Sequence, residues 1–127
     1  GMYDVDEAVV RLNGYVFENF KIIEPGVGVV VLTKEIMNRF DVTPSAASAL
    51  VSTLGSVKGI KAWVFFIEEN NDIRVRLRSK GPVINRIAMK YNGGGHPMAS
   101  GATIYDWDDA DHVIADLVQV CTEYESK

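Results

Sequence analysis

Apolar positions recur with helical spacing in five segments of the chain. Residues typical of helix starts precede three of these segments: Thr33, the Thr43-Pro44 pair and Asp106. Asn92 and the glycine after it are typical of a helix end. The pattern therefore predicts helices over about residues 4–17, 34–40, 44 to 54 or 57, and 82–91, and a last helix after Asp106.

Shorter apolar runs predict strands. Residues 27–32 form a continuous β-branched run, which is typical of a strand buried on both faces. Residues 61–68 and 73–79 flank a polar turn and predict an antiparallel hairpin. Residues 20–23 are a short apolar stretch, and residues 102–105 are a further predicted strand. Helices and strands alternate while the hairpin is antiparallel, so we expect a single α/β domain with a mixed sheet of about five strands flanked by helices.

Length and composition are typical of one soluble globular domain, to which we assign residues 1–127. The single Cys121 excludes a disulfide framework and a cysteine-rich zinc site. No apolar run has the length of a membrane span, and no secretory signal follows Met2. We therefore expect a cytoplasmic protein without a membrane partner, and we interpret Gly1 as a residue left by tag removal.

The net charge of −4 hides a strong asymmetry. The segment 73–96 carries six basic residues and no acid, whereas residues 106–127 carry seven acids and one lysine. In the second strand of the hairpin, the period of two places Arg74, Arg76 and Arg78 on one face. Such a face favours an anionic ligand at close range. It is equally typical of the solvated face of an edge strand.

A glycine-rich segment follows the basic strand and a short helix. Gly93, Gly94 and Gly95 let the backbone approach a ligand closely and turn N–H groups toward an anion, and His96 follows them. Arginine forks match phosphate oxygens, and an imidazole donates to a phosphate or accepts from a ribose hydroxyl. With the Ser79 hydroxyl, these groups predict a phosphate-binding site. By themselves, the glycines are more typical of a helix end and a turn, and a lone histidine is more often structural.

Two stretches of the chain resemble a known family. The run GGGHPMASGA, residues 93–102, resembles the GGGHxxAAGA signature of the DHH-associated domain, which is the C-terminal substrate-binding domain of DHH-family phosphoesterases. The stretch RVRLRSKGPVINRIAMKY, residues 74–91, resembles the segment before that signature in the oligoribonuclease and pAp-phosphatase subgroup, also called exopolyphosphatase-related. The resemblance is sharpest over residues 73–104, and it implies the DHH-associated fold.

The resemblance also implies roles for individual residues. Arg78 and Ser79 match the pair that contacts substrate phosphate, and His96 matches the histidine that reaches the scissile phosphate. Residues 93–95 match the glycine loop that lines the cleft. Arg76 stands where the subgroup often has serine, so it either adds a phosphate contact or faces solvent.

Further residues have weaker signals. Asn85 matches a helix position without an assigned role, and Ser100 replaces the second alanine of the signature, a change that should leave the packing intact. Cys121 lies in an apolar helix stripe and is expected to be a packing residue. Aromatic residues of the first hairpin strand are able to stack on bases but are more typical of a core: Trp63, Phe65 and Phe66.

Catalysis in this family resembles two-metal hydrolysis, usually with manganese, in a separate N-terminal DHH domain. This chain has only two histidines, His96 and His112, and no Asp-His-His run. We therefore expect no catalytic residue, no metal ligand and no bound cofactor in this chain, with manganese implied for the DHH domain. The acids around His112 are interpreted as a helix start, where carboxylates are favourable.

These inferences predict a substrate-binding domain of a metal-dependent phosphoesterase, inactive by itself. The substrates expected are short oligonucleotides, pAp or related phosphoesters and phosphoanhydrides, and the second partner is the DHH domain of the same protein. One alternative is a non-catalytic nucleic-acid-binding module, because the same domain resembles parts of alanyl-tRNA synthetases and RecJ-like exonucleases. Another is a structural domain, which requires the arginines to be scattered in space.

Overall fold

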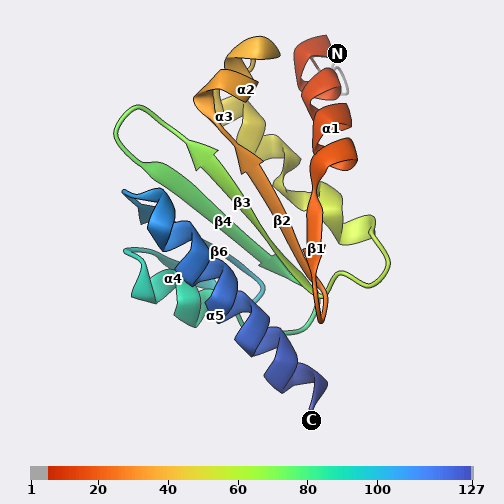
Figure 1. The fold of residues 1–127 in the computed structure, drawn as a ribbon, viewed down its shortest axis with the longest axis vertical. Coiled ribbons are helices and arrows are strands. Elements are labelled where there is room, and N and C mark those ends of the chain that lie inside the picture. Colours follow the sequence, from red (N-terminus) through yellow and green to blue (C-terminus); the bar gives the residue numbers. More distant parts are fainter. Residues whose placement is uncertain (1–5, 127) are drawn as a thin grey trace.

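The computed structural model describes residues 6–126, which form one mixed sheet with helices on both sides (Figure 1). The strand order is β1-β2-β3-β4-β6-β5, with β2 and β3 parallel and the other neighbouring pairs antiparallel. The strands are β1 (Lys21–Ile23), β2 (Val27–Leu32), β3 (Ala62–Glu68), β4 (Ile73–Ser79), β5 (Gly94–His96) and β6 (Ala99–Ile104). The predicted α/β class is confirmed, with six strands instead of about five. Gly1 and the beginning of the helix predicted from residue 4 lie outside the described residues.

Three helices of the described residues begin where the capping residues predict. The helices are α1 (Glu7–Asn19), α2 (Lys34–Arg39), α3 (Pro44–Ala47), the 3₁₀ helix η1 (Ser48–Ser56), α4 (Asn85–Lys90) and α5 (Trp107–Glu125). The hydroxyls of Thr33 and Thr43 each accept a hydrogen bond from the backbone N–H three residues later. The Asp106 carboxylate accepts one from the N–H of Asp108. These three predicted helix starts are confirmed.

The helix predicted from Pro44 onward differs in type. It is α-helical only to Ala47 and continues as the 3₁₀ helix η1. Hydroxyls along this segment donate to carbonyls three residues earlier and so compete with the α-helical pattern. The indole Nε1 of Trp63 also donates to the carbonyl of Val51 at 2.6 Å. Because neither the hydroxyl bonds nor the indole bond follows from apolar spacing, the periodicity could not separate the two helix types.

The helix predicted from Pro82 begins three residues later, at Asn85. The Ser79 hydroxyl accepts from the N–H of Gly81 and donates to the carbonyl of Pro82, which closes a turn. The N–H of Ile84 then donates to the carbonyl of Pro97 rather than within a helix. This turn connects the end of β4 to α4 and thereby fixes both elements that flank the predicted site.

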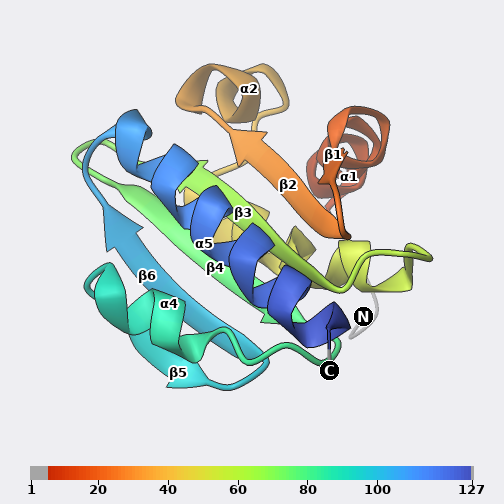
Figure 2. The same cartoon turned by 60° about the horizontal axis from the view of Figure 1, so that its bottom comes forward.

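Two apolar cores fill the two faces of the sheet. α4 and α5 cover one face, and α1, α2, α3 and η1 cover the other (Figure 2). Trp63, Phe65 and Phe66 are at most 5% exposed, so the core interpretation is confirmed for all three. Cys121 is buried, and burial raises the pKa of its thiol, in agreement with a packing role. Among the described helices, none is both long and apolar enough to cross a membrane.

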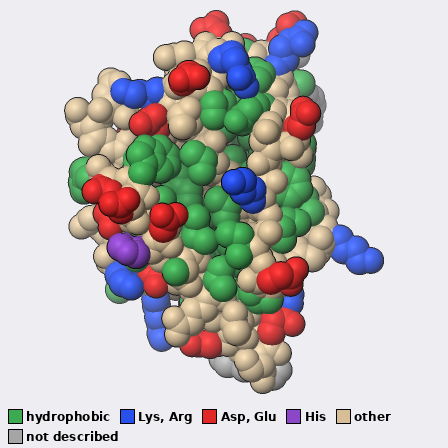
Figure 3. Space-filling model, in the orientation of Figure 1, with side chains coloured by type: hydrophobic (Ala, Val, Ile, Leu, Met, Phe, Trp, Pro, Cys, Tyr) green, Lys and Arg blue, Asp and Glu red, His purple; other side chains and the backbone are tan. Residues whose placement is uncertain are grey.

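The face drawn in Figure 3 carries α5 and the β1 edge of the sheet, and hydrophobic side chains gather across its centre. Val31, on the α5 side of the sheet, is 40% exposed. Val31 and Ile114 line a hollow of about 560 Å³ with residues of α1 and β1. The centre of this face is apolar, and the arginines of β4 lie on the opposite face of the sheet, because the buried residues that alternate with them pack toward α4 and α5.

Candidate phosphate-binding site

The arginines of β4 lie on one face of the sheet, as the period of two predicts. Arg74, Arg76 and Arg78 are half-buried and alternate with buried apolar residues. The cross-strand neighbours on β6, in the same order, are Thr103, Gly101 and Ala99. α4 and α5 pack against the other face of these strands. The arginines therefore share a face whose neighbouring strand carries small side chains, and they are not scattered in space.

Gly94, Gly95 and His96 form an edge strand, β5, rather than the predicted loop. Gly94 lies opposite Gly101 and His96 lies opposite Ala99 on β6, and residues 97–98 form the two-residue connection. β5 is the sixth strand that the pattern missed. Glycine is depleted in strands, and at Gly95 it marks a close approach of backbones rather than a strand propensity.

The structural need for glycine differs between positions 93, 94 and 95. The N–H of Gly93 donates to the carbonyl of Ala88 at 2.9 Å and ends α4, and a Cβ at Gly93 would collide with the carbonyl oxygen of Gly101. Gly95 has a φ of +140°, which side chains rarely allow. A Cβ at Gly94 would meet no atom within 4 Å. The helix-end interpretation is thus right for Gly93, whereas the packing of the described residues does not require Gly94.

Arg78, Ser79 and His96 are brought to the same end of the sheet. Arg78 lies opposite Ala99, and Ala99 lies opposite His96. Arg78 and His96 therefore belong to the same face, two strands and about 10 Å apart at the backbone. The N–H of Ser79 donates to the carbonyl of Met98 at 3.0 Å, which ties β4 to the β5–β6 connection. The Ser79 hydroxyl is engaged in the turn after β4, so its structural role is to shape this end.

Arg78 is the most buried charged side chain at this end of the sheet. Its Nη1 donates to the carbonyls of Leu77 at 2.9 Å and Ser100 at 3.3 Å. Burial lowers the pKa of Arg78, and the positive charge of Arg76 lowers it further. The guanidinium stays protonated at neutral pH because the ordinary pKa of arginine lies far above neutrality. Two neighbouring cations that make no ion pair among the described residues favour the binding of an anion.

A hollow of about 310 Å³ lies between the arginines and the glycine strand. Arg74, Arg76 and Gly94 line it together with Asn92 and Thr103. The hollow confirms that Arg76 and Gly94 lie together, and it adds three residues that the sequence reasoning did not assign to the site: Arg74, Asn92 and Thr103. The alternation along β4 is sufficient to place Arg74 on this face, whereas the position of Thr103 follows only from the register of β6 against β4.

Counter-charges around the arginines are few. Within residues 6–126, Arg74, Arg76 and Arg78 make no ion pair with an acidic side chain. Glu69, in the turn before β4, is the carboxylate whose pKa responds to them: burial and Asp72 raise it, and the charges of Arg74 and Arg76 lower it. Glu69 therefore lies near Arg74 and Arg76, and Arg78 is not among the charges that act on it.

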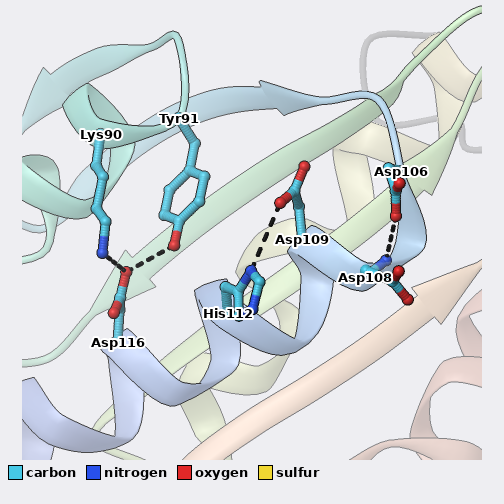
Figure 4. A network of polar contacts seen from close by, with 7 residues as sticks. All are labelled: Lys90, Tyr91, Asp106, Asp108, Asp109, His112 and Asp116. Carbon is cyan, nitrogen blue, oxygen red and sulfur yellow. Dashed lines mark hydrogen bonds and ion pairs between the residues drawn. The ribbon is translucent and has the colours of Figure 1, made fainter.

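The other basic residues of segment 73–96 have different environments. The Lys80 ammonium donates to two carbonyls at the end of η1. The Lys90 ammonium and the Tyr91 hydroxyl both donate to the Asp116 carboxylate, at 3.0 and 2.9 Å (Figure 4). Hydrogen bonding to Asp116 raises the pKa of Lys90. Arg86 is exposed on α4 and lines a hollow with residues of α5. The segment's charge is thus divided, and only the β4 arginines form a row.

The acids around His112 form the start of α5. Asp106 caps the helix, and a carboxylate oxygen of Asp109 lies 3.6 Å from Nδ1 of His112 (Figure 4). In the part of the chain that the structure describes, no three His, Cys, Asp or Glu side chains gather as metal ligands would. These residues therefore do not fit a two-metal centre.

Comparison with known proteins identifies the family. The model of the DHHA1 domain matches residues 26–123. The chain belongs to the DHHA1 domain family. It is 55% identical over 124 residues to the bifunctional oligoribonuclease and PAP phosphatase NrnA of Bacillus subtilis strain 168, covering 98% of this chain and 40% of that protein. The probable NrnA of Streptococcus mutans is 38% identical over 110 residues, which are 86% of this chain and 36% of that protein.

A solved structure shows the same fold. An exopolyphosphatase-related protein from Bacteroides fragilis superposes with a TM-score of 0.82 at 31% identity, covering 97% of this chain and 36% of that chain. The expected DHH-associated fold is therefore confirmed. This DHHA1 domain spans about two fifths or less of the length of these relatives.

Two further residues of the DHHA1 signature region now have structural surroundings. Asn85 Nδ2 donates to the carbonyl of Gly95 at 3.4 Å and so links the start of α4 to β5. Ser100 is 5% exposed, and its hydroxyl has no hydrogen-bond partner among the described residues. A buried hydroxyl without a partner destabilises the folded state.

We expect Ser100→Ala to raise the free energy of unfolding by about 1 kcal/mol, because it removes a buried hydroxyl that gains no hydrogen bond. Urea unfolding of the two proteins measures the difference. An unchanged or lower midpoint for the variant would show that Ser100 has a partner in solution.

Proposed function

We propose that this DHHA1 domain is the substrate-binding part of a metal-dependent phosphoesterase that acts on short oligonucleotides or nucleoside 3′,5′-bisphosphates such as pAp. One observation carries the proposal: the three arginines of β4 share a face and make no ion pair within residues 6–126, and two of them, Arg74 and Arg76, border the open position at Gly94. Guanidinium groups without a carboxylate partner, beside an accessible backbone, are suited to bind phosphate oxygens. The B. subtilis relative, a bifunctional oligoribonuclease and PAP phosphatase, supports the same substrate class.

In this proposal the residues of β4 and β5 hold the substrate and do not cleave it. The Arg78 guanidinium donates to one phosphate, and the His96 imidazole donates to it from across the sheet. Gly94 lets the sugar or phosphate approach the backbone, and Arg76 adds a second positive charge. Ser79 acts by shaping the turn that holds Arg78, because its hydroxyl is engaged there.

The metal site of the proposed enzyme belongs to another part of a longer protein. The described residues do not fit a two-metal centre, and the relatives are at least about twice as long as this chain. We propose an N-terminal DHH domain as the source of the manganese ligands. Metal ions there would stabilise the attacking and leaving oxygens. We accordingly expect the 127-residue chain by itself to show no manganese-dependent hydrolysis.

A titration of the ¹⁵N-labelled chain with pAp tests the proposal, because chemical-shift changes detect weak binding and report on folding in the same spectra. We expect shifts in β4, β5 and β6. Arg78→Ala and His96→Ala should each weaken binding about tenfold or more, as for a lost hydrogen bond to a charged group. Arg86→Ala, which removes an exposed arginine from α4, is the matched control and should bind as the parent. Unchanged affinity in both site variants would exclude the proposed site.

The length of the arginine row favours a short ligand over a long nucleic acid. From Arg74 to Arg78 the strand advances by about 13 Å, which leaves room for only a few phosphates. A long single strand bound by an extended surface would show a steep dependence of affinity on salt, whereas a short ligand shows a shallow one. A steep dependence with a long strand would favour the non-catalytic nucleic-acid-binding alternative.

A further inference from the structure

The exposed side of α1 carries large apolar side chains that the fold leaves uncovered. α1 lies at one side of the molecule (Figure 1), and its buried residues, Leu12 and Val16, belong to the core on one face of the sheet. On the exposed side of the helix, Val10 is 56% exposed and Phe17 is 44% exposed. Apolar side chains that share the exposed side of a helix are typical of a surface that another element covers.

Gly14 lies at the centre of this exposed side, because it is about one helical turn from both Val10 and Phe17. A Cβ at Gly14 would meet no atom within 4 Å, and glycine is less favourable than alanine inside a helix. The packing of the described residues therefore gives no reason for glycine at this position. A missing side chain at the centre of an exposed helix face allows another backbone to approach closely.

The exposed face of α1 has an apolar flank and a charged flank. Val10 and Phe17 are seven residues apart and form the apolar flank, and Arg11 and Glu18, also seven apart, form the charged flank. Arg11 pairs with Glu7 at 2.9 Å, but this pair is largely exposed and contributes little to stability. Glu18 makes no ion pair within residues 6–126. The charged flank thus offers one cation and one anion to a partner.

A second copy of the same face is complementary to this arrangement. When two α1 helices pack antiparallel about a two-fold axis and cross at Gly14, flanks of the same kind meet. Val10 of each copy then lies beside Phe17 of the other, and Arg11 lies beside Glu18, each within about one residue rise, or 1.5 Å, along the helix axis. A parallel pair would instead place the apolar flank against the charged flank. Apolar contact and opposite charge therefore both favour the antiparallel pair.

We propose that α1 is a self-association surface, on which α1 of a second copy of this chain packs antiparallel with its crossing at Gly14. The helix has 13 residues and is about 20 Å long. A single helix pair of this length is smaller than the standard interface of a specific complex, so the association is weak and depends on protein concentration. None of its residues belongs to the proposed phosphate site, so self-association and phosphate binding are tested separately.

Sedimentation equilibrium of the 127-residue chain, from about 10 µM to about 1 mM, tests the proposal. We expect the fraction of dimer to rise over this range. Arg11→Glu brings two carboxylates together in both charged contacts, and Glu18→Arg brings two cations together, so each should weaken the dimer about tenfold or more. An equimolar mixture of the two variants should associate like the parent, because both charged contacts of the mixed pair join opposite charges.

Matched controls separate the interface from net charge and from folding. Arg86→Glu on α4 and Glu123→Arg on α5 change the net charge by the same amounts at exposed positions away from α1, and both should dimerise like the parent. Gly14→Gln fills the crossing with a side chain that favours a helix more than glycine does. It should weaken the dimer about tenfold or more while the dilute protein unfolds at a higher urea concentration than the parent.

Each of the other outcomes overturns part or all of the proposal. A chain that stays monomeric at every concentration excludes self-association. A dimer that neither Arg11→Glu nor Gly14→Gln weakens uses a surface other than α1. Two weakened single variants whose mixture does not associate exclude the antiparallel arrangement. Equal weakening by Arg86→Glu would assign the effect to net charge instead of to contacts of α1.

Discussion

Gly93→Ala is expected to lower the free energy of unfolding by about 3 kcal/mol or more, at the upper end of the effects of overpacking. A Cβ at this position would collide with the carbonyl oxygen of Gly101 and lie 2.6 Å from Cα of Ala102. Both atoms belong to β6, which is paired on one side with β4 and on the other with β5. The backbone there cannot retreat without breaking a ladder, so the collision is not relieved by a side-chain rotation. Urea unfolding followed by circular dichroism measures the loss.

The matched control is Gly14→Ala in α1. A Cβ at Gly14 meets no atom within 4 Å, and alanine is favoured over glycine inside a helix by about 0.5–1 kcal/mol. The control should therefore be more stable than the parent protein. If Gly93→Ala instead unfolds at the same urea concentration as the parent, the close approach of residue 93 to Gly101 and Ala102 described above is wrong.

The parts of the fold that the sequence predicted depend on local rules. The position of Arg76 between Val75 and Leu77 is sufficient to place it on the polar face of a strand. The hydroxyls of Thr33 and Thr43 accept hydrogen bonds from N–H groups only three residues away, so their role is visible in a short window. The core position of Phe65 follows from the apolar run around it.

The parts that the sequence could not predict depend on contacts between distant segments. β5 is a strand because β6 pairs with it, and no propensity of Gly94 or Gly95 indicates this. Thr103 reaches the arginine face only through the register of β6 against Arg74. The 3₁₀ form of η1 depends in part on Trp63, which is 12 residues from its acceptor. In each case a partner elsewhere in the chain overrides the local pattern.

Gly94→Ala is expected to leave stability within about 0.5 kcal/mol of the parent, because its Cβ would enter open space and alanine restricts the unfolded chain more than glycine does. The same methyl group projects into the hollow bordered by Arg74 and Arg76. If that hollow holds a nucleotide, as proposed, the methyl occupies ligand volume. We then expect pAp to bind about tenfold more weakly, which corresponds to about 1.4 kcal/mol. The measurement is the NMR titration with pAp on a variant whose unfolding midpoint is known.

The comparison of Gly94→Ala with Gly93→Ala separates the requirements of the fold from those of the ligand. Adjacent glycines receive the same methyl group, yet only Gly93 has backbone atoms in its way. A stable Gly94→Ala that binds pAp as tightly as the parent would mean that the ligand does not approach β5, and the contact would have to be sought closer to Arg78 and His96. A stable variant with weakened binding, while Gly14→Ala binds normally, would assign the open position at Gly94 to the substrate, because no packing contact among the described residues requires it.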